Sequence, residues 1–421
     1  MINRPRVLVS AYACEPGKGS EPGVGWHWVQ QIAKFADVWV ITRANNKEPI
    51  EERVGKSKIS EDVNWVYYDL PKILRFWKKG QKGIRVYYYL WQIGIFFKAR
   101  KLHKTIGFDL IHHVTIGMYW MPSFLVILDE PLIWGPVGGG EKLPKGFYKT
   151  LSFRGKIYEL IRAVAKWMLE HDPFTRKTIR QSFPLAKAEE TSSRLRNLGS
   201  DNVILFPESG ISIEKIQRHK SYKNNNHFII ASVGRLLHWK GYHLGIRSYA
   251  QIAKKFPYSK YWVMGEGPEK EKLIDLSEKL NISDQVMFFG RLPRDQTLRK
   301  LSECDVLLHP SLHDSGGWVC LEAMALGKPV ICLDHGGPAL QVTDRTGFKI
   351  PPNNPSQTIN GIAESLTRLA SDQTLKSTMG ITGVNRVENY FSWNKKGDFI
   401  ESLYKSVLKN RLDDFKQGKL F

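Results

Sequence analysis

HFIIASVGRL, at residues 227–236, is a short run of β-forming residues that leads into a glycine turn. Four more runs of this kind follow it: YWVMGEG (261–267), QVMFFGRL (285–292), DVLLHPS (305–311) and KPVICLD (328–334). Turn residues and a helical pattern come after each run. Short apolar strands that alternate with helices are typical of a parallel sheet. The second half of the chain is therefore predicted to form a Rossmann-like domain.

The first half repeats this alternation, which predicts a second domain of the same class. Its strand-like runs are RVLVSAY (6–12), DVWVIT (37–42), NWVYYDL (64–70), DLIHHV (109–114) and PLIWGPV (131–137). We expect an α/β protein with two Rossmann-like domains facing a cleft, at residues 1–206 and 207–392. Residues 207–226 have the composition of a linker. The helical tail at 393–421 has no strand to accompany it and is predicted to return to the N-terminal domain.

Composition narrows the function classes. The 421 residues include 62 Lys and Arg against 41 Asp and Glu, a net charge of +21 that favours anionic partners. The four cysteines form no CxxC pair, so neither a zinc site nor a disulfide framework is indicated. A reduced, cytoplasmic location is expected, because no apolar signal segment opens the sequence. The uncharged run at 110–128 contains His, Gly and Pro and is interpreted as a buried strand plus loop.

Glycines are concentrated after the first strand, in CEPGKGSEPGVGW at residues 14–26. Gly17, Gly19, Gly23 and Gly25 would let backbone N–H groups and a helix N-terminus approach a phosphate group without interference from a Cβ atom. This loop is predicted to bind a ligand, although a glycine-rich loop by itself does not identify which one.

Two cations follow the strand at 227–236. Arg235 and Lys240 are five residues apart in GRLLHWKG, and such a pair can converge on a diphosphate. The alternative is two solvated surface charges. A further motif, HDSGGWVCLEAMALGKPV at 313–330, places Asp314 in a loop above a strand and Glu322 in the helix that follows.

Together, GRLLHWKG, GEGP (265–268), FFG (288–290) and the Asp314–Glu322 spacing resemble the retaining nucleotide-sugar glycosyltransferases of family four, which have the GT-B fold. The resemblance is specific over residues 203–393 and looser in the N-terminal half. It implies a hexosyltransferase-like enzyme that moves a sugar from a nucleoside diphosphate to a glycan or lipid-linked acceptor, in polysaccharide or glycolipid biosynthesis.

The resemblance also implies roles for individual residues. Arg235 and Lys240, with Gly23 and Gly25, would hold the donor diphosphate, and Glu322 would bind the ribose. The nucleobase side would be formed by Gly265, Gly267, Phe289 and Gly290. Asp314 would lie toward the transferred sugar as a catalytic residue, although the family usually has Glu there. His113 would lie near the donor sugar, with His112 as the alternative, and the sugar or acceptor side would include Gly139, Gly140 and Glu141.

No D-x-D pair occurs in the sequence, and Arg235, Lys240 and the loop amides could stabilise the leaving diphosphate. We therefore expect no metal and no cofactor. Retention with one candidate carboxylate leaves two mechanisms open, a covalent intermediate and same-face attack assisted by the leaving phosphate.

Residues 72–101 combine basic and aromatic residues and are predicted to contact an anionic membrane surface at its inner, cytoplasmic face. The basic residues include Lys72, Arg75, Lys78, Lys79, Lys82 and Arg85, and the aromatic ones Tyr87, Tyr88, Tyr89, Trp91, Phe96 and Phe97. The alternative is that these aromatics pack into the N-terminal core.

Two other functions stay open at this point. A sugar-nucleotide epimerase would use the same fold, and a nucleic-acid-binding protein would account for the charge. The pattern around Glu322 argues against the first, and the absence of a recognised nucleic-acid motif argues against the second.

Overall fold

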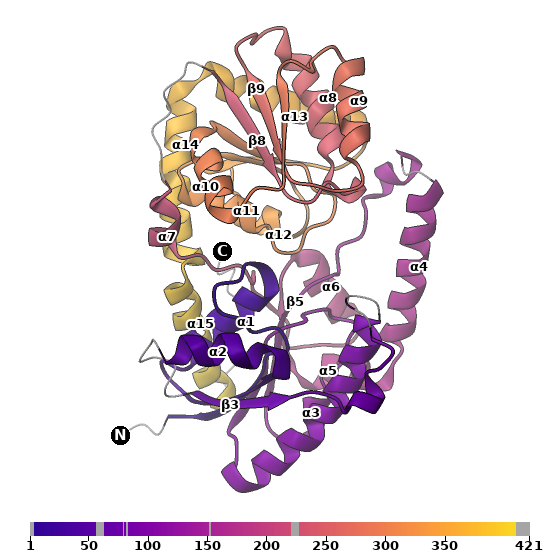
Figure 1. Cartoon of the computed structure of the whole chain (residues 1–421), viewed down its shortest axis with the longest axis vertical. Coiled ribbons are helices and arrows are strands. Elements are labelled where there is room, and N and C mark those ends of the chain that lie inside the picture. Colours follow the sequence, from indigo (N-terminus) through magenta and orange to yellow (C-terminus); the bar gives the residue numbers. More distant parts are fainter. Residues whose placement is uncertain are drawn as a thin grey trace. The chain divides into compact units, whose positions relative to one another are not determined.

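The computed structural model describes residues 4–55, 63–78, 80, 83–150, 153–219 and 227–409. The chain forms two compact units (Figure 1). Of the described residues, unit 1 comprises those at 4–140, 161–208 and 393–409, and unit 2 those at 141–160 and 209–392. The predicted linker lies partly outside the described residues, at 220–226, and its described part includes the short helix α7 (Ile213–Gln217).

Unit 1 is built on a seven-stranded parallel sheet with the order β3-β2-β1-β4-β5-β6-β7. Its strands are buried on both faces, which explains why they read as nearly continuous apolar runs; Val7, Leu8 and Val9 in β1 are inaccessible to solvent. The strands are β1 (Arg6–Ser10), β2 (Asp37–Arg43), β3 (Val63–Tyr68), β4 (Leu110–His113), β5 (Leu132–Val137), β6 (Phe183–Ala186) and β7 (Ile204–Leu205).

Helices cover this sheet, and one of them comes from the C-terminal part of the chain. The predicted return of the tail is confirmed, because α15 packs against α1 and the Tyr404 hydroxyl lies 2.7 Å from His112 Nδ1 on β4. The helices of unit 1 are α1 (Ser20–Ile32), α2 (Lys47–Val54), α3 (Ile84–Ile106), α5 (Pro173–Gln181), α6 (Glu189–Asn197) and α15 (Trp393–Leu408). The helix α4 (Phe153–Glu170) begins in unit 2 and ends in unit 1.

Unit 2 contains a six-stranded parallel sheet with the order β10-β9-β8-β11-β12-β13. The two faces of this sheet pack into separate clusters of buried side chains, because successive side chains of a strand point to opposite faces. One cluster contains Ile230 and Ile331, and the other contains Ile229 and Val330. The strands are β8 (Ile229–Val233), β9 (Lys260–Met264), β10 (Val286–Gly290), β11 (Val306–His309), β12 (Val330–Leu333) and β13 (Gly347–Ile350).

The described residues of the segment 141–160 belong to unit 2, whereas the predicted N-terminal domain at 1–206 included them. Phe147 is fully buried in the core of unit 2, and the Tyr158 ring stacks on Trp239 with centroids 5.8 Å apart. The other helices of unit 2 are α8 (Tyr242–Ala253), α9 (Lys270–Lys279), α10 (Arg294–Glu303), α11 (Trp318–Ala325), α12 (Gly336–Gln341), α13 (Pro355–Ser371) and α14 (Gln373–Arg386).

The interpretation of residues 110–128 as a buried strand plus loop is confirmed. It forms β4 and a 3₁₀ turn at Phe124–Ile127, and most of its side chains are buried. Among the described residues, no helix is both long enough and apolar enough to cross a bilayer.

Three aromatic residues of α3 correct part of the predicted membrane segment at 72–101. Tyr87, Tyr88 and Trp91 are buried in the core of unit 1, where Tyr12 makes edge contacts with all three rings. These rings therefore cannot contact lipid. Phe97, farther along α3, is 63% exposed, and before α3 Ile73 and Phe76 are 80% and 77% exposed. Lys79 and Lys82 lie outside the described residues.

The glycines after β1 have a different position from the predicted one. Helix α1 begins at Ser20, so Gly23 and Gly25 lie inside its first two turns rather than in the preceding loop. A Cβ atom on Gly25 would lie 2.0 Å from the Ala13 carbonyl oxygen, and one on Gly23 would lie 2.1 Å from the Lys18 carbonyl oxygen. The absence of a side chain thus allows α1 to pack directly against the loop that follows β1.

Replacing Gly25 by Ala is expected to destabilise unit 1. The added methyl group would overlap backbone that cannot move like a side chain, and overpacking of this kind typically costs about 1–3 kcal/mol. A lower midpoint in thermal unfolding would measure the loss. Gly55→Ala is the matched control, because its Cβ would lie 3.8 Å from the nearest backbone oxygen. Equal midpoints for the two variants would contradict the steric role of Gly25.

Candidate functional site

The candidate site of unit 2 lies at the carboxyl ends of β8 and β11. These two neighbouring strands mark the point at which the strand order reverses. Ligands of open parallel sheets bind outside the carboxyl ends of the strands at such a switch point. The loop after β8 carries Arg235 and Lys240, and the loop after β11 carries Asp314.

Asp314 is the centre of the polar contacts in these loops. Its Oδ1 accepts hydrogen bonds from the backbone N–H groups of Gly316 and Gly317, both at 3.0 Å. Its Oδ2 lies 2.5 Å from Lys240 Nζ and 3.0 Å from His309 Nε2. The carboxylate therefore joins the loop after β8, the end of β11 and the glycine turn that precedes α11.

The surroundings of Asp314 favour its charged form. Burial by itself would raise its pKa, but the attraction of Lys240 and the hydrogen bond and charge of His309 outweigh burial and hold the pKa well below its usual range. Asp314 is thus an ionised group with both oxygens occupied. His309 was not identified from the sequence, although its position at the end of a buried strand is a signal that could have indicated it.

Arg235 and Lys240 have different environments. Arg235 is exposed on the loop after β8, whereas Lys240 ends a short 3₁₀ helix (His238–Lys240) and is partly buried by its contact with Asp314. Joint binding of one anion by these two cations remains a prediction.

Glu322 lies in the first two turns of α11 and is buried. Its Oε1 is 2.7 Å from Arg294 Nη2, a partner that comes from the start of α10. Burial raises the pKa of Glu322, and Arg294 opposes that rise. Arg294 was missed in the sequence analysis because nothing in its local sequence links it to a carboxylate 28 positions away.

The predicted nucleobase side consists of loops whose backbones approach one another closely. The Gly265 N–H donates to the Gly290 carbonyl at 2.8 Å, and the Gly234 N–H donates to the Met264 carbonyl at 2.9 Å. A Cβ atom on Gly265 would lie 1.9 Å from the Gly234 carbonyl oxygen, and one on Gly267 would lie 2.4 Å from the Leu236 carbonyl oxygen. These glycines join the ends of β8, β9 and β10, and Phe289 lies beside them, partly buried.

Glu141 belongs to unit 2 and is buried beside the Asp314 loop. The Ser315 hydroxyl donates to Glu141 Oε2 at 3.0 Å, and Gly336 lies close to its Cγ atom. Gly139 and Gly140 belong to unit 1. There, the Gly140 N–H donates to Thr191 Oγ1, and a Cβ atom on Gly139 would overlap the Trp120 ring.

The two histidines of β4 point to opposite faces of the sheet in unit 1. His112 contacts the Tyr404 hydroxyl and the Gly135 carbonyl, whereas His113 Nε2 lies 2.8 Å from the Tyr88 hydroxyl and 3.0 Å from the Thr115 carbonyl. Burial lowers the pKa of His112 to about 3 and that of His113 to about 4, so both are neutral. A carbonyl can only accept, so His113 Nε2 carries the proton, and Nδ1 is an acceptor without a hydrogen-bond partner among the described residues.

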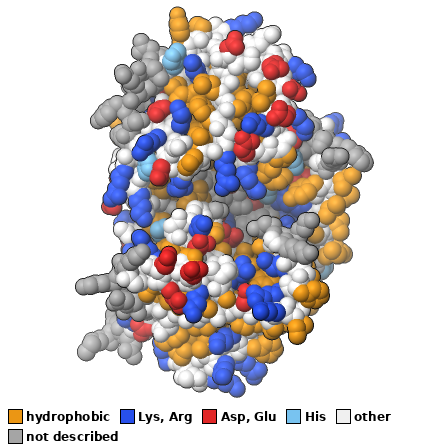
Figure 2. All heavy atoms as spheres, in the orientation of Figure 1, with side chains coloured by type: hydrophobic (Ala, Val, Ile, Leu, Met, Phe, Trp, Pro, Cys, Tyr) orange, Lys and Arg blue, Asp and Glu red, His pale blue; other side chains and the backbone are white. Residues whose placement is uncertain are grey.

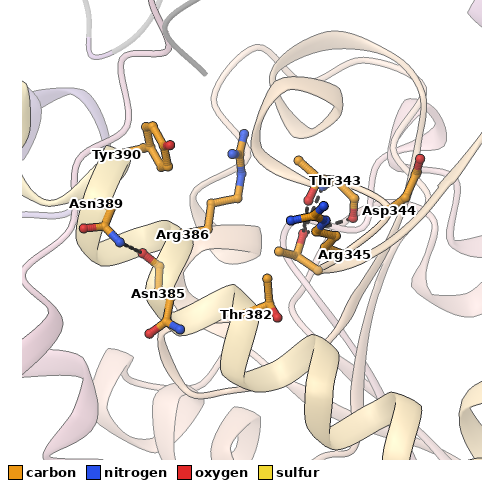
Figure 3. A pocket seen from close by; sticks show the side chains of 9 residues that line it. Thr343, Asp344, Arg345, Thr382, Asn385, Arg386, Asn389 and Tyr390 are labelled. Atoms are coloured by element: carbon orange, nitrogen blue, oxygen red, sulfur yellow. Dashed lines mark hydrogen bonds between the residues drawn. The ribbon is translucent and has the colours of Figure 1, made fainter.

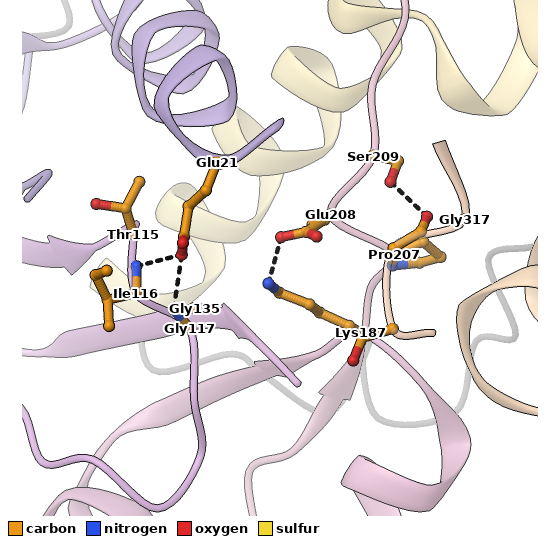
Figure 4. A network of polar contacts seen from close by, with 12 residues as sticks. Glu21, Thr115, Ile116, Gly117, Gly135, Lys187, Pro207, Glu208, Ser209 and Gly317 are labelled. Atoms are coloured by element: carbon orange, nitrogen blue, oxygen red, sulfur yellow. Dashed lines mark hydrogen bonds and ion pairs between the residues drawn. The ribbon is translucent and has the colours of Figure 1, made fainter. Parts of the chain in front are cut away.

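Polar contacts also order the loop after β4 (Figure 4). Glu21, in the first turn of α1, accepts hydrogen bonds from the N–H groups of Ile116 and Gly117 at 2.6 and 3.3 Å. The Ala13 N–H donates to Thr115 Oγ1 at 3.0 Å. The loops after β1 and β4 are therefore bound to each other, again at a strand-order switch point.

A cavity of about 480 Å³ lies elsewhere in unit 2 (Figure 3). Part of its wall is the loop that precedes β13, so the cavity lies at the amino ends of the strands, whereas Asp314 lies at their carboxyl ends. It is lined by Thr343, Asp344, Arg345, Thr346, Thr382, Asn385, Arg386, Asn389 and Tyr390. Among the residues that the structure describes, no cluster of three or more His, Cys, Asp or Glu side chains has the arrangement of a metal site.

Comparison with known proteins finds a family to which part of the chain is similar. Residues 213–380 match the model of the glycosyl transferases group 1. The chain is 29% identical to the capsular polysaccharide biosynthesis glycosyltransferase CapM of Staphylococcus aureus over 235 residues, which are 53% of this chain and 57% of CapM. Matches to curated relatives span from 42% to 66% of the relative's length.

Solved structures match over almost the whole chain. Sucrose-phosphate synthase from Thermosynechococcus elongatus has a TM-score of 0.68 at 19% identity, covering 97% of this chain and all of that one. The Anabaena protein HepE, in complex with UDP and glucose, has a TM-score of 0.59 at 18% identity, covering 96% of this chain and all of that one. The two parallel sheets found here are those of this fold. Residues 213–380 are therefore similar to the group 1 glycosyltransferases, and the two units have the GT-B fold of these solved structures.

Proposed function

We propose that this protein transfers a sugar from a nucleoside diphosphate to a glycan or lipid-linked acceptor, with retention of anomeric configuration and without a metal ion. The observation that carries the proposal is the contact of Asp314 with Lys240, His309 and the glycine turn before α11, inside the domain that matches the family. The complex of HepE with UDP and glucose supports a nucleotide donor.

Positive charge at the carboxyl ends of β8 and β11 would stabilise the leaving diphosphate. Lys240 is held in place by Asp314, Arg235 is exposed on the same loop, and α11 begins directly after the glycine turn. A helix N-terminus and preorganised cations favour an anion without rearranging at the moment of reaction. These groups account for the charge stabilisation that a metal supplies in other transferases.

Asp314 acts as a positioning residue in this proposal rather than as the nucleophile. A carboxylate offers about four acceptor positions, and four donors already occupy those of Asp314. Attack on a sugar carbon would require it to give up Lys240 or His309. Of the two retaining mechanisms, we therefore propose same-face attack assisted by the leaving phosphate.

Glu322 and His113 would accept hydrogen bonds from hydroxyl groups of the ribose and of the sugar, respectively. Glu322 has one oxygen engaged by Arg294, and its carboxylate would accept from the ribose hydroxyls. His113 Nδ1 could accept from a sugar hydroxyl, because it is an acceptor without a partner among the described residues. Phosphate binding by Gly23 and Gly25, and the sugar or acceptor roles of Gly139, Gly140 and Glu141, remain predictions.

The enzyme would meet a lipid-linked acceptor at a membrane surface. We propose that unit 1 contacts this membrane surface through a short exposed segment, called the tip. The tip consists of residues 72–76, where Ile73, Leu74 and Phe76 are exposed beside Lys72. Exposed apolar side chains next to a cation are the combination expected at an anionic bilayer surface.

Incubation with a panel of nucleotide sugars and glycan or polyprenyl-phosphate acceptors is expected to give a transfer product in the presence of EDTA, detected by mass spectrometry. Arg235→Ala is expected to lower the rate about 10²–10³-fold, the usual effect of removing one preorganised charge-stabilising group. A strict requirement for Mg²⁺ or Mn²⁺ would overturn metal independence. An epimerised nucleotide sugar as the only product would overturn transfer, and an inverted anomer would overturn retention.

Lys240→Met is expected to destabilise unit 2 near neutral pH by about 1–3 kcal/mol, because it leaves the partly buried Asp314 charge without its main partner. The pKa of Asp314 is lowered by folding, so its stabilising effect is present above the ordinary Asp pKa of about 3.9 and is lost as the pH falls through the lower, folded value. The deficit should therefore shrink below about pH 4. Urea titrations from pH 3 to 8 would measure it.

Lys270→Met is the control for that series, because the Lys270–Glu266 pair lies on the surface. A surface pair contributes little, so this variant should match the wild type at every pH. A pH-independent deficit in Lys240→Met would instead mean that the lysine stabilises unit 2 through packing alone.

Arg294→Ala is expected to make nucleotide binding more dependent on pH. Without Arg294, burial of Glu322 is unopposed and its pKa rises further, so less of the accepting carboxylate is present at pH 6 than at pH 8. Calorimetry with UDP and other nucleoside diphosphates should show a larger loss of affinity between pH 8 and pH 6 than in the wild type, with partial recovery in Arg294→Lys. The same pH profile in Arg294→Ala and the wild type would exclude this role.

A further inference from the structure

Helix α4 carries an apolar stripe on its exposed surface. Its side chains are separated by three or four positions and are between 41% and 64% exposed. Figure 2 shows hydrophobic side chains gathered over α4, at the right-hand edge of the view. Residues at this spacing share one face of a helix. The apolar stripe consists of Ile157, Leu160, Ile161, Val164, Trp167 and Met168.

The opposite face of α4 carries charged residues that contact the protein. Lys166 Nζ donates to the Gly139 carbonyl at 2.5 Å and lies 5.1 Å from the centre of the Trp120 ring. One turn later, the buried Glu170 forms an ion pair with Arg194. An ordinary surface helix buries its apolar face and exposes its polar face. The second half of α4 does the reverse, so its exposed face lacks the cover that such a surface normally has.

Among the described residues from 142 to 170, every exposed charged side chain is a lysine, whereas Glu159 on α4 is partly buried. Lys142, Lys145, Lys149 and Lys156 are exposed in and before α4, and none of the described acidic side chains between residues 142 and 170 is exposed. Exposed Tyr148 adds an aromatic ring to this basic stretch. The net charge of the chain is +21, which opposes the approach of a second copy and favours an anionic surface.

We infer that α4 lies in the plane of an anionic lipid bilayer, with its apolar stripe at the boundary between headgroups and acyl chains. A helix with one apolar face, a Trp at its edge and flanking lysines binds to such an interface without crossing it. A spanning arrangement is excluded because Lys166 and Glu170 are held against the protein. The inference rests on the proposed membrane contact and adds a second element to the tip at 72–76.

The first test measures binding of the full-length protein to vesicles. Wild type is expected to co-sediment with vesicles of phosphatidylglycerol and phosphatidylcholine, and weakly with phosphatidylcholine alone. Leu160→Asp with Val164→Asp should lower the partition coefficient at least tenfold without changing the thermal midpoint, since both side chains are exposed. Ile381→Asp is the matched control, because Ile381 is a similarly exposed residue on α14, and it should bind like the wild type.

The second test reports where α4 lies. Val164→Cys, labelled with an environment-sensitive fluorophore, should gain intensity and shift to the blue with anionic vesicles, whereas a label at Ile381→Cys should not. Selective labelling is feasible because all four native cysteines are buried. Lipids with a quencher at a shallow acyl position should quench the label at residue 164.

The outcomes separate this inference from the proposals on which it rests. Loss of binding in Ile73→Asp with Phe76→Asp, together with an unchanged, water-exposed label at residue 164, would overturn the role of α4 and leave the tip as the contact. A dimer in light scattering that Leu160→Asp with Val164→Asp dissociates, without vesicle binding, would make a second copy the occupant. Transfer to a water-soluble acceptor without any vesicle binding would overturn both membrane contacts and leave the transferase activity standing.

Discussion

The Asp314 carboxylate is the interaction on which the candidate site depends. One oxygen fixes the N–H groups of the glycine turn, and the other holds Lys240 and His309. A carboxylate that is largely withdrawn from solvent is stable only when it is paired and hydrogen-bonded, and the side chain of Asp314 is 17% exposed, so these four partners offset its partial burial. The same contacts place a lysine and the start of α11 at the carboxyl ends of β8 and β11, which is where an anionic ligand of this fold would bind. The contacts of Asp314 therefore both stabilise unit 2 and fix the position of the Lys240 charge.

Close approach of backbones is the second constraint. Gly265 and Gly25 lie where a Cβ atom would come within about 2 Å of a carbonyl oxygen, and each joins a strand end or helix to a neighbouring loop. In unit 2 this brings the ends of β8, β9 and β10 into a continuous, hydrogen-bonded edge. The glycines of α1 have a packing role of this kind in unit 1. The high frequency of glycine in and beside these loops thus reflects close contact between backbones, as well as any approach of a ligand.

Burial divides the basic and aromatic residues of the chain into two groups with different meanings. Tyr87, Tyr88 and Trp91 stabilise the core of unit 1, although they stand in a basic segment that resembles a membrane anchor in sequence. The apolar stripe on α4 shows the opposite case. Its sequence is an ordinary amphipathic pattern, which would normally be buried, but the structure leaves this apolar face exposed. Hydrophobic periodicity shows that a helix has two faces, but it does not show which face the protein covers.

The sequence alone determined the two Rossmann-like domains, the return of the C-terminal helix and the similarity of residues 213–380 to the group 1 glycosyltransferases, because strand and helix periods and the motifs from Arg235 to Glu322 are local patterns. It also determined the residue types of the site. Only the tertiary structure decided their partners: His309 and Lys240 on Asp314, Arg294 on Glu322, and the assignment of residues 141–160 to unit 2. These contacts join residues from different elements, and Arg294 and Glu322 are 28 positions apart. Partner choice depends on how elements pack, and packing leaves no periodic signal in any one segment of the chain.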